Sequence, residues 1–366
     1  MILLPFYIIG FLVIWWCYLG YPIFLARKPE MPLKASSNRT GTFSILVPTF
    51  NEKGQVKAKI ENLRKLEYPK AKFRIIFVDG GSKDGTIEEI RHSKGVRLFV
   101  SRRGGKINDI NSVLPKLKTD YVMITDADSI ISSNTLKEFN KILNDPETGA
   151  VGAYTKPTKS TREEMDFWET NNRLRLLESR FFSSSTMIAA SYAFRRKLIP
   201  KFEEDVIADD LFSTFKVLSK NYKVIYTDKA TALERRNPST FSEMVKHKSR
   251  KASANIRETL RFLPYTGKNR FWRIIYPTKV LQTIFIPLLL PIFVLLSLLY
   301  LFYNPFLVVF LVTISLITIL MNPVNGGGKS GIFSKIKILF IINLILLYAI
   351  LSYPFAKNTS RYKKTK

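Results

Sequence analysis

Acidic residues recur in this chain in short clusters, two of which follow apolar runs. Asp79 ends one run, Asp126 and Asp128 flank a single alanine after another, and Asp209 and Asp210 form a third cluster. Two neighbouring carboxylates are costly unless a cation joins them, and Mg²⁺ or Mn²⁺ prefers oxygen ligands of this kind. The pair Asp126 and Asp128 therefore predicts a site that holds Mg²⁺ or Mn²⁺ against a diphosphate, although a solvated turn would have the same composition.

Glycines and one lysine accompany these acids. Gly104-Gly105-Lys106 stands at the start of a predicted helix, where free backbone amides and a lysine favour phosphate. Asp79 is placed to accept hydrogen bonds from a nucleotide, and its alternative role is to form the turn or cap before the next helix. Glu52 has two roles of equal weight, either orienting a ribose or base or serving as a first-turn acid that favours the helix dipole.

The third acidic cluster suits proton transfer. Close carboxylates push one pKa upward, which is what a general base needs, so Asp209 and Asp210 are candidates for that role. An acidic helix N-terminus is the competing interpretation. The two histidines, His92 and His247, are too few and too far apart to suggest a histidine metal site.

The elements around these clusters alternate in type. Apolar runs at 43–47, 73–78, 96–100 and 121–125 read as strands, and the stretches 53–66, 84–91 and 106–117 read as helices. Such alternation predicts an α/β fold with a parallel, doubly wound sheet. Ligands gather at the carboxyl ends of the strands in such sheets, so Asp79, Asp126 and Asp128 should converge on one crevice.

After Asp128 the pattern is looser. Residues 134–143, 163–182 and 211–218 read as helices, and residues 150–154 and 187–194 read as strands. The stretch 241–263 is basic and amphipathic, which predicts a helix that lies on a membrane surface.

Both ends of the chain carry apolar segments of membrane length. Residues 2–26 have no charge and read as an uncleaved anchor. Residues 280–321 are also uncharged, with a break at Tyr303-Asn304-Pro305, and a last segment runs over 338–355 after a flexible turn at 325–329. The sequence thus predicts four spans, although the basic tail 357–366 conflicts with the orientation that four spans impose.

The net charge and the cysteine content of the chain limit which binding partners and cross-links can be expected. The net charge is +28, which fits either solvated basic faces or attraction to anionic lipids and phosphorylated substrates. The basic residues are dispersed and no nucleic-acid motif accompanies them, so no nucleic-acid partner is predicted. Basic residues follow the first apolar segment, which places residues 27–277 in the cytoplasm of a multi-pass membrane protein. The single Cys17 excludes an internal disulfide framework.

Taken together, residues 43–251 resemble the family 2 inverting glycosyltransferases with a glycosyltransferase A (GT-A) fold, and the flanking segments look like those of membrane-embedded members such as polysaccharide synthases. The resemblance implies that Asp79 contacts the nucleotide base, that Asp126 and Asp128 hold the diphosphate and metal, and that Asp210 is the catalytic base. It further implies a nucleotide-sugar donor, with substrate-binding roles for the residues Pro48, Glu52, Lys106, Asp209 and Arg250.

Two departures from this family are visible. Its processive members carry Q-x-x-R-W, whereas this chain has His247-Lys248-Ser249-Arg250-Lys251 there, so only the arginine is retained. The acidic pair is Asp-Asp where the synthases usually have Glu-Asp. The missing tryptophan favours transfer of one or a few sugars to a lipid-linked or polyprenyl acceptor. A processive polysaccharide synthase of the hyaluronan, chitin or poly-N-acetylglucosamine type is the close alternative, and a nucleotide-sugar-binding membrane protein without activity is the second.

The predicted organisation is therefore an anchor at 1–26, a GT-A catalytic domain at 27–240, a basic interfacial segment at 241–277, a C-terminal membrane region at 278–356 and the basic tail.

Overall fold

The computed structural model describes residues 3–34, 39–101, 104–236, 240–265, 267–322 and 332–353. The chain divides into two compact units. A sheet unit is formed by Pro32–Ser160 and Ser183–Ser239, and a helical unit is formed by Met1–Met31, Thr161–Phe182 and Thr240–Ala356. The predicted turn at 325–329 and the basic tail lie outside the described residues.

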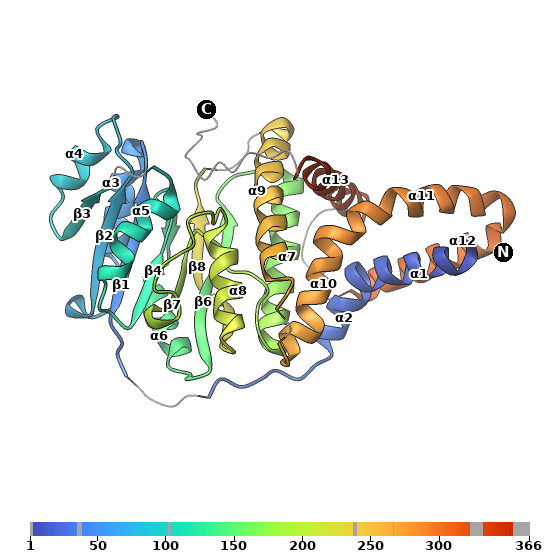
Figure 1. The fold of residues 1–366 in the computed structure, drawn as a ribbon, viewed down its shortest axis with the longest axis horizontal. Coiled ribbons are helices and arrows are strands. Elements are labelled where there is room, and N and C mark those ends of the chain that lie inside the picture. The colour runs from blue at the N-terminus through green and yellow to red at the C-terminus, as the bar shows by residue number, and fades with distance from the viewer. Residues whose placement is uncertain are drawn as a thin grey trace. The chain divides into compact units, whose positions relative to one another are not determined.

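The sheet unit is built on eight strands in the order β3-β2-β1-β4-β7-β6-β8-β5 (Figure 1). Their bounds are β1 Phe43–Thr49, β2 Phe73–Asp79, β3 Val96–Val100, β4 Tyr121–Ile124, β5 Ser129–Ile131, β6 Thr148–Pro157, β7 Tyr192–Arg195 and β8 Lys223–Glu234. Every residue of β1 and β4 is buried, as expected for strands that are covered on both faces.

The sheet is mixed, and this corrects the prediction of a purely parallel one. Strands β3, β2, β1 and β4 are parallel neighbours, as the sequence predicted. Strand β7 pairs antiparallel with both β4 and β6, and β5 pairs antiparallel with β8. The short β5 and the long β8 were not predicted. Strand β5 follows the turn Thr125–Asp128 and is too short to stand out as a separate apolar run.

Helices of the sheet unit follow the predicted positions closely. They are α3 Lys53–Arg64, α4 Thr86–Arg91, α5 Lys106–Val113, α6 Thr135–Leu143 and α8 Asp209–Ser219. Helix α4 begins two residues later than predicted, because Asp84 accepts hydrogen bonds from the backbone and hydroxyl of Thr86 and so closes the preceding turn. Gly85, in the left-handed conformation, is the residue at the N-cap position.

The core of the sheet unit consists of fully buried apolar side chains, most of them aromatic or branched. It includes Phe43, Ile45, Val47, Phe77, Met123, Phe139, Tyr192, Phe194, Phe202 and Phe212.

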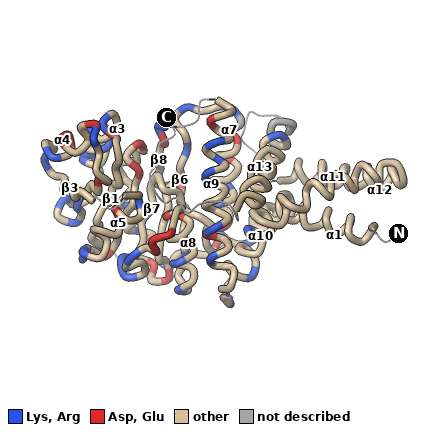
Figure 2. The backbone as a smooth tube through the Cα atoms, turned by 45° about the horizontal axis from the view of Figure 1, so that its top comes forward, with Lys and Arg blue, Asp and Glu red and all other residues tan. Residues whose placement is uncertain are grey.

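The helical unit holds the apolar segments. A continuous helical stretch covers Leu3–Ala26, with α1 Leu3–Trp15 and α2 Tyr21–Ala26 joined by a π-helical turn. A second covers Phe271–Tyr303 and contains α10 Tyr276–Val280 and α11 Ile286–Tyr303. By length and composition these two are long and apolar enough to cross a membrane. Figure 2 shows that α1 and α11 carry no charged residue.

Two further apolar helices follow. Helix α12 Pro305–Met321 starts at the predicted break, where the side chain of Asn304 accepts a hydrogen bond from the backbone of Leu307 at 3.2 Å. Helix α13 Ile332–Ser352 ends the described chain. Their apolar parts, Pro305–Ile319 and Ile336–Ser352, are shorter than the first two apolar stretches. The third and fourth of the four predicted spans therefore stay a prediction.

Two more helices complete the unit, α7 Arg162–Phe181 and α9 Phe241–Phe262. Helix α7 comes from within the segment that the sequence assigned to the catalytic domain, yet it packs with α2 and α13. The apolar side chains Ala252 and Ile256 of the basic helix α9 pack against Ile345 and Ala349 of α13. Part of the face that was predicted to lie on a membrane is therefore covered by another helix.

Candidate functional site

The predicted convergence of polar side chains begins at the ends of β1 and β2. Thr49 and Asp79 are register partners in these parallel strands, and the Thr49 hydroxyl donates to Asp79 Oδ2 at 2.9 Å. Strand β4, which ends at Ile124 just before the Asp126 turn, pairs with the other side of β1. The carboxyl ends of three neighbouring strands thus present their polar residues at one edge of the sheet, as the sequence predicted.

Asp79 is fully buried and has four donors of its own. In addition to Thr49, the backbone amides of Gly81 and Ser82 donate to Oδ1 at 2.9 and 2.7 Å, and the Ser82 hydroxyl donates to Oδ2 at 2.7 Å. Gly81 has φ of +90°, a conformation that only glycine adopts readily and that turns both amides back toward the carboxylate. These contacts support the alternative role of Asp79, which is to form the turn after β2.

The Asp126 turn is tied to the third acidic cluster by Lys106, the first residue of α5. Its Nζ lies 2.9 Å from Asp126 Oδ1 and 3.0 Å from Asp209 Oδ1. Burial lowers the pKa of Lys106, but the two carboxylates outweigh burial and hold it well above its ordinary value. The lysine that the sequence assigned to phosphate is therefore a permanent cation between two acids.

Asp128 lies beside a cation that the sequence analysis missed. Arg236 donates to both carboxylate oxygens of Glu52, at 3.1 and 2.6 Å, and its Nε lies 3.9 Å from Asp128 Oδ2. Burial raises the pKa of Asp128 and so does the charge of Asp126, while Arg236 opposes both. Glu52 stands just before α3 without capping it by its side chain, so the arginine determines its position. The doublet Arg235-Arg236 after β8 was the signal available in the sequence.

The two acids of the third cluster have different surroundings. Asp209 is 3% exposed and accepts a 2.7 Å hydrogen bond from the Tyr192 hydroxyl, in addition to the contact with Lys106. Asp210 is half-buried, and its Oδ2 accepts from the backbone of Ala189 at 3.1 Å. Both lie in the first turn of α8, where the helix dipole stabilises negative charge. Asp209 is thus held by two protein side chains and Asp210 is nearer to solvent, and the predicted substrate role of Asp209 stays a prediction.

The donor set suits a hard divalent ion that keeps other ligands. Within the described ranges no group of three or more histidine, cysteine and acidic side chains could hold a metal ion by itself. Asp126 and Asp128 offer carboxylate oxygens, and a bound cation would oppose the effects of burial and of Asp126 that raise the pKa of Asp128. Mg²⁺ and Mn²⁺ commonly take one or two carboxylates and complete their shell with phosphate oxygens and water.

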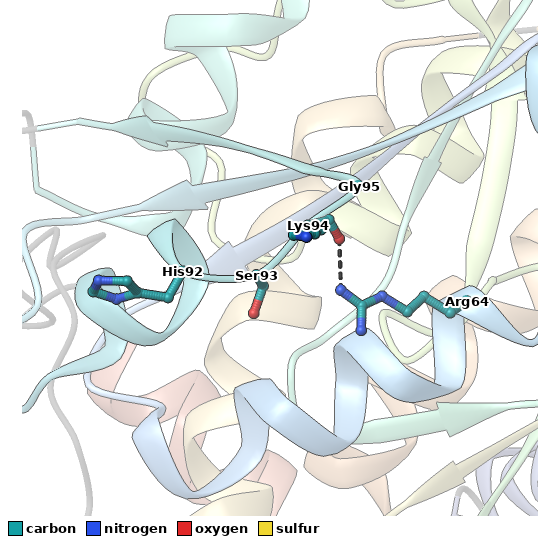
Figure 3. Close-up of a pocket in the computed structure, with 5 residues that line it drawn as sticks. All are labelled: Arg64, His92, Ser93, Lys94 and Gly95. Carbon is teal, nitrogen blue, oxygen red and sulfur yellow. Dashed lines mark hydrogen bonds between the residues drawn. The ribbon is translucent and has the colours of Figure 1, made fainter.

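The remaining predicted residues are Pro48 of the sheet unit and Arg250 of the helical unit. Pro48 is buried within β1. Arg250 is an exposed residue of α9 in the helical unit, so its substrate role stays a prediction. His92 lines a shallow cavity with Arg64, Ser93, Lys94 and Gly95 (Figure 3). This cavity borders the amino end of β3, whereas the carboxylates lie at carboxyl ends, so no histidine of the sheet unit joins the site.

Comparison with known proteins gives a family match over the sheet unit. Residues 44–202 match the model of "Glycosyl transferase family 2". The chain is 27% identical over 198 residues to the poly(ribitol-phosphate) beta-N-acetylglucosaminyltransferase TarS of Staphylococcus aureus, covering 51% of this chain and 34% of TarS. It is 26% identical over 192 residues to the beta-monoglucosyldiacylglycerol synthase of Trichormus variabilis, covering 48% of this chain and 40% of that protein. The chain thus spans well under two thirds of both relatives.

One solved structure resembles nearly the whole chain. The mannosyltransferase PcManGT from Pyrobaculum calidifontis, solved with GDP-Man and Mn²⁺, aligns with a TM-score of 0.72 over 96% of this chain and 97% of that one, at 20% identity. This likeness, together with the mixed eight-stranded sheet, establishes a fold consistent with GT-A.

Proposed function

On the premise that this chain carries a family 2 glycosyltransferase domain, we propose that it is a membrane-bound inverting enzyme that transfers a sugar from a nucleoside-diphosphate sugar to a lipid-linked or polyprenyl acceptor. The observation that carries the proposal is the grouping of Asp126, Asp128 and Asp209 around Lys106 and Arg236, next to the half-buried Asp210. The two long apolar helices support a membrane setting. The relative named for a glucosylated diacylglycerol supports a lipid acceptor.

The proposed reaction is a single displacement at the anomeric carbon of the donor. The acceptor hydroxyl attacks that carbon, the bond from the carbon to the diphosphate oxygen breaks, and the nucleoside diphosphate leaves with the bonding electrons. Asp210 takes the hydroxyl proton as general base, a role that typically contributes about 10²- to 10⁴-fold to rate. A polyprenyl phosphate acceptor is already anionic, so its transfer would depend less on Asp210.

The diphosphate is assigned to the acidic turn and its cations. Asp126 and Asp128 would hold the divalent metal, which when bound neutralises charge on the leaving diphosphate. Lys106 and Arg236 keep the carboxylates in place and add positive charge, and Arg250 is proposed to contribute from α9. The Tyr192 hydroxyl and Lys106 fix Asp209, which holds the first turn of α8 and therefore Asp210 in position. PcManGT was solved with Mn²⁺, so Mn²⁺ is the first metal to supply, with Mg²⁺ as the second.

A second candidate is glycosylation of a polymer, including processive polysaccharide synthesis. TarS is named for a poly(ribitol-phosphate) acceptor, which favours this candidate. The degraded Q-x-x-R-W stretch argues for short products.

The test is transfer by the full chain in native-lipid membranes, with a panel of radiolabelled nucleotide sugars and Mn²⁺ or Mg²⁺. We expect label in the organic extract that disappears in Asp128→Ala and after EDTA, and that returns when Mn²⁺ is added back to the wild type. Asp228→Ala, which removes an exposed carboxylate of β8, is the matched control and should keep full activity. Asp128-dependent label in high-mass material would replace the lipid acceptor with a polymer. No Asp128-dependent label in either fraction would overturn the proposed activity in favour of a binding protein.

A further inference from the structure

A lysine with no exposed surface lies next to the acidic turn. Lys59 projects from α3, and its side chain is completely buried. Its Nζ contacts three neutral oxygens, namely Thr125 Oγ1 at 2.7 Å, the Ser129 carbonyl at 2.8 Å and Ser129 Oγ at 3.0 Å. An ammonium has three hydrogens to donate, and these three oxygens can accept all of them.

The three oxygens belong to the residues that flank the turn. Thr125 directly precedes Asp126, and Ser129 directly follows Asp128. The turn is further closed by Ser129, whose backbone amide and hydroxyl lie 3.3 and 2.8 Å from the Asp126 carbonyl. Lys59 therefore binds both ends of the loop that carries the two carboxylates. The spacing of Asp126 and Asp128 depends on where these ends are held.

The same cluster reaches the segment that supports the proposed base. The hydroxyls of Thr125 and Ser129 lie 2.6 and 2.9 Å from the Ala190 carbonyl. The preceding residue, Ala189, donates its amide to Asp210. Hydrogen bonds thus link Lys59 through Thr125 to Ala190, and the adjoining residue Ala189 is hydrogen-bonded to Asp210.

Packing alone does not account for a lysine at this place. A buried charge is costly, and replacing buried ionic groups by apolar residues of similar volume is often neutral or stabilising. Burial lowers the pKa of Lys59 to about 7, and the charges of Asp126 and Asp128 oppose this shift. The lysine and the two carboxylates therefore interact electrostatically although no hydrogen bond joins them.

We propose that Lys59 is a positioning residue for the acidic turn: by binding Thr125 and Ser129 from inside the protein, it sets the geometry in which Asp126 and Asp128 bind the divalent metal and the donor diphosphate. This inference rests on the proposed function. Outer-shell partners of metal ligands typically change metal affinity by about 10- to 100-fold when they are removed. Loss of Lys59 should therefore weaken metal and donor binding more than it lowers kcat at saturating metal and donor.

The test compares Lys59→Met with Lys223→Met. Lys223 is also buried, with its side chain 7% exposed, but it pairs with Glu147 near the start of β6 and β8 and contacts no site residue named above. Mn²⁺ affinity is measured from the loss of the electron paramagnetic resonance signal of free aqueous Mn²⁺, alone and with GDP or UDP. In parallel, the transfer assay gives the half-saturating Mn²⁺ concentration, the donor KM and kcat.

For Lys59→Met we expect a Mn²⁺ dissociation constant and a half-saturating Mn²⁺ concentration about 10- to 100-fold above wild type, with kcat at saturating Mn²⁺ reduced much less. Lys223→Met should lower stability without changing Mn²⁺ affinity. Thr125→Val, which keeps the lysine and removes one of its acceptors, should raise the same two constants by a smaller factor. It is the deciding variant if Lys59→Met does not accumulate as folded protein.

The outcomes separate this inference from the proposed function. An active wild type whose Mn²⁺ affinity is the same in Lys59→Met, or in Thr125→Val when only that variant folds, would overturn the positioning role alone. An equal loss of affinity in Lys223→Met would also overturn it, since general destabilisation would then explain the effect. A wild type that neither binds Mn²⁺ nor transfers sugar would contradict both.

Discussion

At the scale of single residues, the neighbouring aspartates Asp209 and Asp210 differ in burial and in their hydrogen-bond partners. Asp209 is buried between a lysine and a tyrosine hydroxyl, whereas Asp210 is half-buried and accepts hydrogen bonds from the backbone amides of Ala189 and Leu211. Burial of Tyr192 raises its pKa well above the ordinary value, and the charge of Asp209 adds to that effect, so the phenol stays protonated and keeps donating. The acid nearer to solvent is the one that can meet an acceptor.

Asp210→Asn should lower kcat for an acceptor with a neutral hydroxyl by about 10²- to 10⁴-fold while donor binding is retained, because the amide cannot take the proton. The measurement is single-turnover transfer together with binding of the labelled donor. A fall of less than tenfold with a polyprenyl phosphate acceptor is expected on the same grounds. An unchanged rate with a neutral hydroxyl acceptor would remove Asp210 from the role of base.

Part of this site could be predicted residue by residue and part could not. Asp126 and Asp128 follow an apolar run, and Asp209 and Asp210 are paired before a predicted helix, so local pattern was enough to single them out. Their partners come from distant parts of the chain. Lys59 looks like any lysine of an amphipathic helix until the strands that bury it are placed. Arg236 is 184 positions from Glu52, and no local pattern pairs them.

At the scale of elements, strand β6 meets its neighbours without room for a side chain at Gly149. A Cβ there would lie 2.6 Å from Val217 Cγ1 of α8, 2.7 Å from Leu198 Cδ1 and 2.7 Å from Tyr222 Cβ. The register of β6 against β8 is irregular at this same point. The glycine thus lets α8, which carries Asp209 and Asp210 in its first turn, approach the sheet.

Gly149→Ala should therefore lower the free energy of unfolding by about 1–3 kcal/mol, the usual cost of overpacking a core. Gly54→Ala is the matched control, because no atom lies within 4 Å of a Cβ at that position in α3. There the helix gains, by up to about 1 kcal/mol, from the better propensity of alanine. Thermal unfolding of both variants in the same detergent measures the difference, and equal midpoints would contradict the close approach at β6.

Helix α9 carries a histidine whose charge is suppressed by its neighbours. Burial lowers the pKa of His247 to about 3, with further lowering by Lys251, Arg250 and Lys248. The unfolded chain binds a proton near pH 6.5, and the folded chain does not until about pH 3. Stability is thus full above about pH 6.5 and is lost progressively as the pH falls toward 3.

His247→Gln should reduce the loss of stability between pH 7 and pH 4.5, since glutamine takes up no proton. The unfolding midpoint at the two pH values gives the result, with the exposed His92→Gln as the control that keeps the wild-type loss. The same acid sensitivity in His247→Gln and wild type would mean that His247 is protonated in the folded protein.

At the scale of elements, too, local sequence pattern predicts only part of the structure, as the sheet shows. Strands β1, β2 and β4 were predicted from apolar runs between turn residues. Their alternation with helices correctly predicted that they run parallel. The antiparallel β7 could not be read in this way, because direction depends on the path of the intervening 67 residues from Thr125 to Ser191 and not on local composition.

At the scale of the whole molecule, the unequal distribution of charge is the main observation. The net charge of +28 is carried outside α1, α11 and α12, which have no charged residue. We expect the full chain to stay with membranes after extraction at alkaline pH, and residue 159 to face the cytoplasm. The basic residues that follow Ala26 set this orientation.

A single engineered cysteine tests that orientation. Lys159→Cys in a Cys17→Ala background should react with a membrane-impermeant maleimide only after the cells are opened, because Lys159 is exposed on the sheet unit. The Cys17→Ala background alone is the unlabelled control. Labelling in intact cells would place the sheet unit outside, away from the compartment in which nucleotide sugars are made.

The packing of α9 against α13 also bears on how the chain is synthesised. Ala252 and Ile256 leave the ribosome almost a hundred residues before Ile345 and Ala349, the side chains that cover them. Helix α7 also contacts α13, so this contact too can form only after α13 has been synthesised. For that interval the parts of α7 and α9 that α13 covers lack this neighbour, although α7 can already contact α2. The contacts with α13 are therefore completed late in translation, and until then the apolar faces that α13 covers are open to aggregation.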